Sequence, residues 1–264
     1  MFKRFARLHV LTLLGGLLLT TACTAQSSAP APYTEGNEYV TLPAPYQRYG
    51  SDGKVEVVEV FSYGCIHCAH FAPIAEKLRK QLPAGSVLKL LPAPFSAEWL
   101  PFARAYYAAK QMGVVERTHM QLFDAKFAQN YPINSMDELA DFYALEGVNR
   151  DQFMKIATSD ETTAKMKGDL ALIQKWGVDG TPSIVVDGKY KVSNVQTPDE
   201  LAAVALWLAK RELSGKLAGR LALRVVVCPA DATFISAGSC SAALAGRCMH
   251  LHDRRLSFPS SVLR

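Results

Sequence analysis

The stretch Val55-Glu-Val-Val-Glu-Val-Phe-Ser-Tyr-Gly-Cys-Ile-His-Cys68 decides the fold of this chain. Its first seven residues are mostly β-branched and apolar, and turn-forming residues flank them at 51–53 and 62–64. A short apolar run between two turns is typical of a strand that is buried on much of both faces. We therefore predict a strand over 55–61 that leads directly to the cysteine pair.

A helix and a second strand are predicted to follow. From Cys65 onward, apolar residues recur at helical spacing, at Phe71, Ile74 and Leu78. Residues 87–91 are again apolar and predict another strand. A strand, a helix and a strand in this order form a βαβ unit, which implies a parallel strand pair joined by a right-handed crossover.

The pattern changes to purely helical periodicity between Trp99 and Trp176. Five helical segments are predicted there, at 102–111, 114–127, 135–145, 150–157 and 161–176. Two strands follow at 183–186 and 190–192, joined by an Asp-Gly turn that is typical of a hairpin. A capping Thr197 and a proline after it then begin a last helix that is expected to end near Leu213. The fold class is therefore α/β, interrupted by a helical insertion.

These patterns divide the chain into six regions. We predict a signal peptide at 1–25, a flexible tether at 26–38, the first part of the α/β fold at 39–98, the inserted helical subdomain at 99–176, the second part of the α/β fold at 177–213 and a C-terminal extension at 214–264. The extension has no sustained period, so disorder is one interpretation of it, and a strand over 220–227 is another.

The first 25 residues have the order of an export signal. Three basic residues precede an apolar stretch at 10–19, which is too short for a typical membrane span. The run Leu19-Thr-Thr-Ala-Cys23 resembles a bacterial lipoprotein signal, in which the cysteine is lipidated, but Thr20 replaces the usual leucine. Cleavage after Ala22 or Ala25 without a lipid is the alternative, and an uncleaved buried helix is a third. Export is predicted, and a lipid anchor stays open.

Composition and charge exclude some classes of protein. The 264 residues are 49% hydrophobic and 20% charged, which is typical of a globular protein and not of a disordered or multi-span membrane protein. The net charge is +5, but the excess of basic residues lies at the two ends of the chain. Nucleic-acid binding is therefore not predicted, because a binding face would need basic residues in the folded middle.

The six cysteines do not form the pattern of a disulfide framework. Cys23 lies in the signal region, Cys65 and Cys68 form a close pair, and the remaining three, Cys228, Cys240 and Cys248, lie near the C-terminus. The pair belongs to the motif Cys65-Ile66-His67-Cys68 at a junction between a strand and a helix. This motif is the strongest chemical feature of the sequence.

The position of Cys65 at the start of a helix favours its thiolate. Free backbone N–H groups and the positive end of the helix dipole stabilise an anion there, and a protonated His67 would add to this effect. Cys65 is therefore the predicted nucleophile and Cys68 the resolving thiol. Since a stabilised thiolate stabilises the reduced form, the Cys65–Cys68 disulfide is expected to be a strong oxidant.

Other interpretations of the cysteine motif are weaker. Cys65, Cys68, His67 and His70 could bind zinc, but four ligands within six residues would hardly reach tetrahedral geometry. A c-type haem needs a histidine directly after the second cysteine, where Ala69 stands. A purely structural disulfide would close too small a loop to constrain the unfolded chain much. No metal and no cofactor are predicted besides the redox-active cysteine pair itself.

A second motif, Gly180-Thr181-Pro182, lies just before the strand at 183–186. The strand leading to the cysteine motif, the helical insertion and this Gly-Thr-Pro together resemble the DsbA-type thiol:disulfide interchange proteins of the thioredoxin superfamily. The resemblance covers about residues 39–213. It implies a thioredoxin fold with an inserted helical subdomain. By itself, Pro182 could also be an ordinary proline at the entry of a strand.

The resemblance also implies roles for particular residues. Pro182 would be cis and face the cysteines, and the backbone beside Thr181 would pair with an extended substrate peptide. Glu59 matches the family's partly buried acid beneath the cysteines, which transfers a proton from Cys68; a solvent-facing strand acid is the alternative. His67 matches the family's histidine. Ile66, at the substrate-facing position between the cysteines, replaces the proline most common there, which leaves the redox potential open.

The predicted function is the introduction of disulfide bonds into exported proteins in the periplasm. The expected partners are reduced, unfolded exported proteins and, from the resemblance, a quinone-linked membrane reoxidase of the DsbB type, with the chain itself acting as a monomer. One alternative is a periplasmic disulfide reductase or isomerase, although there is little room for a dimerisation domain before residue 39. Another is a chaperone that uses the groove near Pro182 without redox chemistry.

Overall fold

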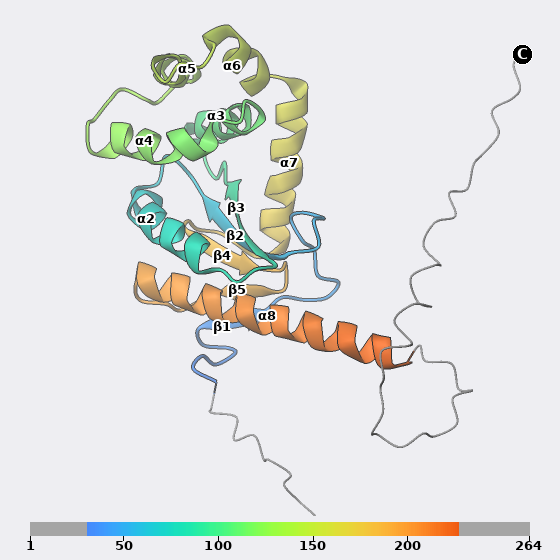
Figure 1. The fold of residues 1–264 in the computed structure, drawn as a ribbon. Helices are drawn as coiled ribbons and strands as arrows, with labels where there is room; N and C mark the ends of the chain where they lie inside the picture. The colour runs from blue at the N-terminus through green and yellow to red at the C-terminus, as the bar shows by residue number, and fades with distance from the viewer. Residues whose placement is uncertain (1–30, 227–264) are drawn as a thin grey trace, which may run out of the picture. The chain divides into compact units, whose positions relative to one another are not determined.

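The computed structural model describes residues 31–226, with side chains up to residue 219. Its centre is a five-stranded mixed sheet of order β1-β5-β4-β2-β3 (Figure 1). The predicted βαβ unit is present, as β2 (Val55–Phe61), α2 (Ile66–Gln81) and β3 (Ser86–Pro92). β2 and β3 are parallel, and every residue of β2 is buried. The predicted burial of this strand is therefore confirmed.

The remaining strands run antiparallel to their neighbours. β4 (Ser183–Val186) pairs with β2, and the hairpin partner β5 (Tyr190–Val192) pairs with β4. The turn between them places Asp187 and Gly188 at positive φ, as a tight hairpin requires. A three-residue strand, β1 (Tyr39–Thr41), completes the sheet against β5 and was not predicted. It closes the edge that the hairpin would otherwise leave free.

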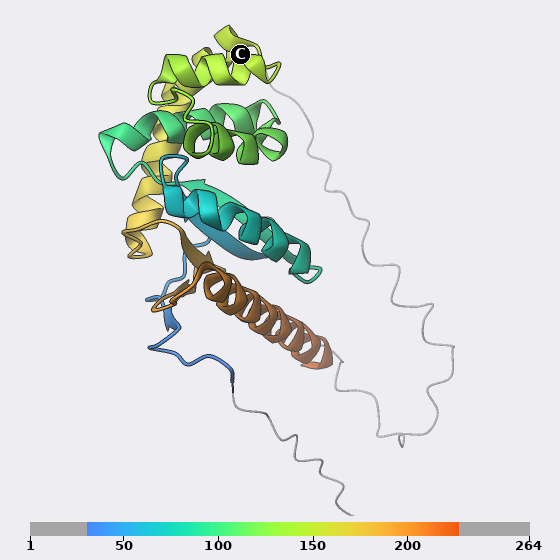
Figure 2. The ribbon, with the colours of Figure 1, turned by 90° about the vertical axis from the view of Figure 1, so that its left-hand side faces the viewer.

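Helices cover both faces of the sheet. Because side chains alternate along a strand, Val55 and Val57 of β2 face one side and Val58 and Val60 the other. The first side packs against α2 and against α8 (Pro198–Val226), which run side by side in Figures 1 and 2. The second side packs against the end of α7 (Asp160–Lys175) through Ile173.

The inserted helices form a second core beyond the end of β2. They are η1 (Ala97–Trp99), α3 (Leu100–Gln111), α4 (Val115–Phe127), α5 (Met136–Leu145), α6 (Arg150–Ala157) and α7. The predicted segments at 102–157 agree with α3 to α6 to within two residues at their starts and coincide with them at their ends. Polar caps explain the sharp starts of three of them: Ser135, Asn149 and Ser159 accept hydrogen bonds from the first turns of α5, α6 and α7. Phe61, Cys65 and Cys68 belong to this same core, so the insertion packs directly on the cysteine motif.

The end of α8 corrects one prediction. The helix does not end near Leu213 but continues to Val226, and residues 220–226 are helical rather than a strand. Lys210, Leu213, Lys216 and Leu217 continue the helix because residues of this kind have high helix propensity, which outweighs the cost of Gly215. The first 13 residues of the predicted extension are therefore part of a helix. The signal region with Cys23, the start of the tether and the C-terminal cysteines lie outside the described residues.

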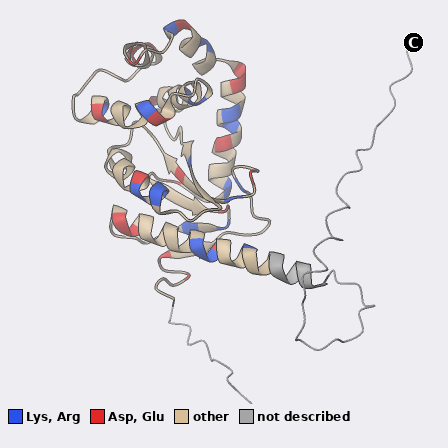
Figure 3. Cartoon of the chain, viewed as in Figure 1, with Lys and Arg blue, Asp and Glu red and all other residues tan. Residues whose placement is uncertain are grey.

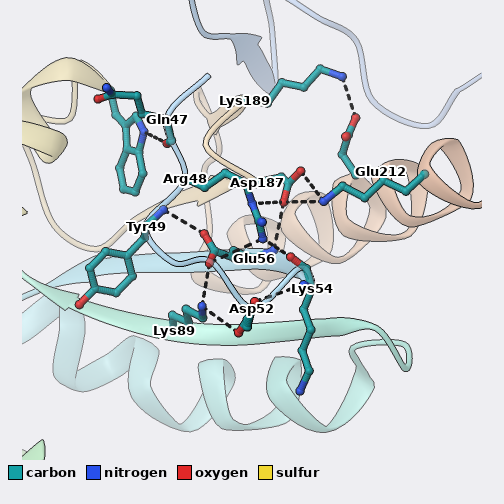
Figure 4. A network of polar contacts seen from close by, with 12 residues as sticks. Gln47, Arg48, Tyr49, Asp52, Lys54, Glu56, Lys89, Asp187, Lys189 and Glu212 are labelled. Carbon is teal, nitrogen blue, oxygen red and sulfur yellow. Dashed lines mark hydrogen bonds and ion pairs between the residues drawn. The ribbon is translucent and has the colours of Figure 1, made fainter. Parts of the chain in front are cut away.

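A polar network fixes the loop before β2 to the sheet (Figure 4). Glu56 of β2 is fully buried, and its carboxylate accepts hydrogen bonds from Lys89 Nζ at 2.7 Å and from the backbone N–H of Tyr49 at 2.9 Å. Asp187 forms ion pairs with Arg48 at 2.9 Å and with Lys216 of α8 at 2.8 Å. The network thus connects the loop before β2 with β2, with β3, with the turn after β4 and with α8.

Residues of both charges occur along the helices of the described part. In the cartoon of Figure 3, Lys and Arg positions are interspersed with Asp and Glu positions, and α8 begins with two acids, Asp199 and Glu200, in its first turn. The two acids at the start of α8 suit the positive end of the helix dipole. The mixture of basic and acidic residues along the helices does not form the long basic face that nucleic-acid binding needs. Among residues 31–226, no helix has the length and apolar character needed to span a bilayer.

Candidate active site

Cys65 is the N-cap residue of α2, as the sequence predicted. Its backbone is extended, with φ −101° and ψ 116°, and its side chain does not cap the helix. The first N–H groups of α2 are therefore free to face the sulfur. Cys65 is 6% exposed and Cys68 is fully buried, and both are free thiols. This difference in access makes Cys65 the sulfur that an incoming thiolate reaches.

The two thiols have very different pKa values because their surroundings differ. A hydrogen bond from Cys68 is the main cause that lowers the pKa of Cys65 to about 5, and Thr181 and the backbone N–H groups of Cys68 and His67 add to it. Burial opposes this shift without cancelling it. Burial, followed by the interaction with Cys65, raises the pKa of Cys68 far above its ordinary value. At neutral pH the pair therefore holds one thiolate, on Cys65, and one proton, on Cys68.

Glu59 lies on the α2 side of β2, in phase with Val57. It is 1% exposed, so it is not a solvent-facing strand acid. Burial, and next the charge of Cys65, raise the pKa of Glu59 to about 8. Its Oε2 is buried and has no hydrogen-bond partner among the described residues. Such a carboxyl group holds a proton near neutral pH and can exchange it.

The second predicted motif lies beside the first. The Thr181–Pro182 peptide bond is cis, and the Cys65 thiol is 3.5 Å from the carbonyl oxygen of Thr181. The cis geometry agrees with what the resemblance implied. The sequence separates these residues by 116 positions, and the pairing of β4 with β2 brings them together.

A groove of about 530 Å³ opens over the two motifs. Cys65, His67 and Thr181 line it, and Ile66, 39% exposed, stands at its rim. Of the residues predicted to contact a substrate, Ile66 and Thr181 line this groove. Pro182 does not line it but follows Thr181 directly in the chain.

Two aromatic residues of the groove were missed by the sequence analysis. Phe95 and Trp99 form its opposite wall, with their ring centroids 6.4 Å apart. A Cβ atom added to Gly64 would lie 2.7 Å from the Trp99 ring, so the absence of a side chain at position 64 lets the indole pack against the cysteine loop. The only available signal was the run of apolar and aromatic residues after the second predicted strand, and it does not say which face they cover.

Metal binding finds no support in the described part of the chain. No group of three or more His, Cys, Asp or Glu side chains there is placed to hold a metal ion. His67 and His70 are both exposed, whereas Cys68 is fully buried, so these side chains do not converge on one point.

Comparisons with known proteins agree with the geometry. The family model of the DSBA-like thioredoxin domain matches residues 56–204. The thiol:disulfide interchange protein DsbA of Pseudomonas aeruginosa is 31% identical over 202 residues, which cover 76% of this chain and 95% of the relative. DsbA of Azotobacter vinelandii is 31% identical over 206 residues, covering 77% and 96%.

Solved structures show the same fold. The crystal structure of Pseudomonas aeruginosa DsbA has a TM-score of 0.65 at 32% identity, covering 70% of this chain and 96% of that one. The oxidoreductase DsbA from Xylella fastidiosa has a TM-score of 0.65 at 35% identity, covering 69% and 98%. The predicted fold class and family are thus confirmed. This chain belongs to the DSBA-like thioredoxin-domain family and is a thiol:disulfide oxidoreductase.

Proposed function

We propose that the chain acts as an oxidase, which introduces disulfide bonds into reduced proteins exported to the periplasm. The observation that carries this proposal is the lowering of the Cys65 pKa to about 5 beside a buried, protonated Cys68. A low pKa makes Cys65 a good leaving group and stabilises the reduced enzyme. Both effects favour passing the disulfide to a substrate.

The proposed reaction has two exchange steps. A substrate thiolate attacks the Cys65 sulfur of the Cys65–Cys68 disulfide, so a mixed disulfide forms and Cys68 leaves as a thiolate that takes up a proton. A second substrate thiolate then attacks the substrate sulfur of the mixed disulfide and releases Cys65 as a thiolate. The substrate loses two electrons and gains a disulfide, and the enzyme becomes the dithiol.

Three side chains and one backbone segment are assigned supporting roles. Glu59 supplies or removes the proton of Cys68, because its raised pKa lets it exchange a proton near neutral pH. His67 adds positive charge near Cys65 when it is protonated. Ile66 and the backbone of Thr181, next to cis-Pro182, contact the extended substrate peptide in the groove.

The partners and the location belong to the same proposal. A quinone-linked membrane reoxidase of the DsbB type would return the dithiol to the disulfide, and the enzyme would act as a monomer. Residues 1–25 would direct export to the periplasm, with or without a lipid on Cys23. Mass spectrometry of the mature N-terminus separates the two cleavage alternatives, since lipidation adds acyl chains to that residue.

The test combines a variant pair with a redox potential. Cys65→Ser should abolish oxidation of a reduced two-cysteine peptide, while Cys68→Ser, supplied with oxidised glutathione as the oxidant, should accumulate mixed disulfides on Cys65. The potential of the wild-type pair, measured against glutathione, should be clearly more oxidising than that of thioredoxin. A thioredoxin-like potential would instead favour the reductase or isomerase. Binding of a client with an unchanged thiol count would favour the chaperone.

A further inference from the structure

A second and larger cavity, of about 750 Å³, lies away from the cysteines. It is enclosed by residues from α2, β3, α3, α4 and α7 together with the loop at Tyr49 and Gly50. None of its lining residues borders the groove over Cys65. Its volume is in the range of pockets that bind small molecules, and the proposed redox cycle does not use it.

Much of the cavity wall is apolar. Leu90 of β3, Tyr106 of α3 and Val115 of α4 contribute to it, and Met120 stands at the exposed end with 43% of its surface accessible. A methionine is flexible enough to adapt to ligands of different shape. This wall can therefore take up the hydrocarbon part of a ligand.

The charged groups of the cavity are predominantly basic. Four cations line it, Arg79, Lys89, Lys110 and Lys165, against two carboxylates, Glu76 and Glu116. His119 also lines it, but burial is the main cause that lowers its pKa to about 4, so it is neutral at pH 7. Among the residues that line the cavity, cations thus outnumber carboxylates by four to two.

Three of the four cations already have acidic partners. Arg79 pairs with both cavity carboxylates, Glu76 and Glu116. Lys89 is 2.7 Å from Glu56 and 3.0 Å from Asp52, and Lys165 is 2.5 Å from Asp169. Each of these three cations is therefore already paired with at least one carboxylate, which leaves Lys110 as the remaining cation of the lining.

Lys110 is different, because no acidic side chain pairs with it among residues 31–219. Its ammonium group lies over the rings of Tyr49 and Tyr106, at 5.5 and 5.6 Å from their centroids. Burial, and next the charge of Lys165, lower the pKa of Lys110. Asp169 offsets part of this shift, and the side chain is exposed, so an anion beside Lys110 could counter the repulsion from Lys165 without displacing an acidic partner.

The ring of Tyr49 contacts two of the cavity lysines. Lys165 Nζ lies 4.9 Å from the centre of its ring, on which Lys110 also packs. Its hydroxyl is buried and has no hydrogen-bond partner among the described residues. Asp169 lies nearby, but it already accepts hydrogen bonds from Tyr107 and Lys165. Burial, and next the Asp169 carboxylate, raise the pKa of Tyr49, and this carboxylate can still accept from its hydroxyl, so the contribution of Tyr49 to the cavity is its ring, which both lysines contact.

We propose that this cavity binds a small amphipathic organic anion. The apolar body of the ligand lies against Leu90, Val115 and Met120, and its carboxylate or sulfonate group lies beside Lys110. The apolar wall binds the hydrocarbon part of such a molecule, and the unpaired cation binds its acidic group. The site is separate from the disulfide chemistry, so the inference does not rest on the proposed oxidase function.

The test uses 4-phenylbutanoate and its uncharged counterpart 4-phenylbutan-1-ol as probes. Each is titrated into the ¹⁵N-labelled, oxidised protein, and the affinity and the shifted amide signals are recorded by NMR. The acid should bind about fivefold more tightly than the alcohol, because only the acid pairs with Lys110. The signals that shift should come from the cavity elements, α2, β3, α3 and α4.

Variants of Lys110 separate charge from packing. Lys110→Met keeps the length of the side chain and should reduce the affinity for the acid to that for the alcohol, whereas Lys110→Arg should keep most of the difference. Lys155→Met removes an exposed lysine of α6 outside the cavity and should change neither affinity. Melting curves confirm that each variant is folded.

Three results would overturn the proposal. Equal affinities for the acid and the alcohol would show that the cavity does not distinguish an anion from an uncharged ligand. Unchanged acid binding in Lys110→Met would assign the anion to another cation. Shifts confined to residues around Ile66 and Trp99 would place the ligand in the catalytic groove and leave this cavity without a ligand of this class.

Discussion

The Cys65 sulfur lies 3.5 Å from the carbonyl oxygen of Thr181, the residue before cis-Pro182. The reactive sulfur is thus held between the start of α2 and the loop before β4, two segments that only the sheet brings together. In the proposed function, an extended substrate peptide that reaches Cys65 lies beside the Thr181 backbone. The reacting sulfur and the proposed peptide-binding backbone of Thr181 therefore lie next to each other.

The acidity of Cys65 leads to the first prediction. Alkylation of the reduced protein by iodoacetamide should follow a titration with a midpoint near pH 5, since the pKa of Cys65 is lowered to about 5. Cys68 should stay unmodified at pH 6, because burial keeps it protonated. Rates measured by mass spectrometry between pH 4 and pH 8 check this. A midpoint near that of free cysteine would contradict it.

The same assay tests the main cause of the shift, the hydrogen bond from Cys68 to Cys65. Cys68→Ala removes the donor and should raise the midpoint of Cys65 by about one pH unit or more. Cys68→Ser keeps a donor of similar size and should raise it less. If both variants kept the wild-type midpoint, the helix terminus and not the Cys68 side chain would be responsible for the acidity.

The two glutamates of β2 provide a matched comparison of buried carboxyl groups. Glu59 has a raised pKa, so the stability that its protonated form provides is complete below pH 4.5 and is lost as the pH rises through about 8. In the reduced protein, to which this pKa applies, Glu59→Gln should therefore become more stable relative to wild type as the pH rises from 4.5 to 8. Urea unfolding at the two pH values measures the difference. A constant difference would mean that Glu59 is charged throughout.

Glu56 should show the opposite behaviour. It is buried on the other face of β2, but it is bonded to Lys89 and to the backbone of Tyr49. Glu56→Gln should destabilise the protein by about 2 kcal/mol at pH 7, because it leaves Lys89 and Arg48 without their buried partner. A stabilising effect would show that desolvation of Glu56 outweighs its ion pairs.

Gly64 allows a test of the groove wall. Gly64→Ala places a Cβ atom 2.7 Å from the Trp99 ring and should displace it. The KM for a reduced peptide should then rise several-fold while the alkylation midpoint of Cys65 stays the same. Gly168→Ala is the control, since its Cβ atom would meet nothing within 4 Å on α7. It should leave KM unchanged and stabilise the protein by about 0.5–1 kcal/mol. An unchanged KM in Gly64→Ala would remove Trp99 from the substrate site.

Asp187 tests how α8 is attached to the sheet. Asp187→Asn keeps a residue that tolerates the observed φ of 53° but removes the charge that pairs with Arg48 and Lys216. It should cost about 2 kcal/mol in thermal or urea unfolding. Lys216→Met should cost less than about 1 kcal/mol, because Asp187 keeps Arg48. The reverse order of the two losses would show that Lys216 is the main partner.

Several features were determined by the sequence alone, because they depend on local order along the chain. The β-branched run at 55–61 predicted a buried strand, and the cysteines directly after it predicted a thiolate at a helix start. The resemblance carried by Gly180-Thr181-Pro182 predicted the cis bond. Such patterns can be recognised before folding because they depend only on residues that are close together in the sequence.

Other features were decided by the tertiary structure. A strand as short as β1 has no detectable period, and it exists because β5 offers it hydrogen bonds. The burial of Glu59 depends on which helices cover that face of the sheet, and the sequence of β2 does not contain this information. Phe95 and Trp99 come from one short segment, but the groove that they line also includes Cys65 and Thr181, and the cavity at Lys110 is built from segments between residues 49 and 165. Burial and the pairing of charges depend on the sum of such distant neighbours, so they arise only when the chain is folded.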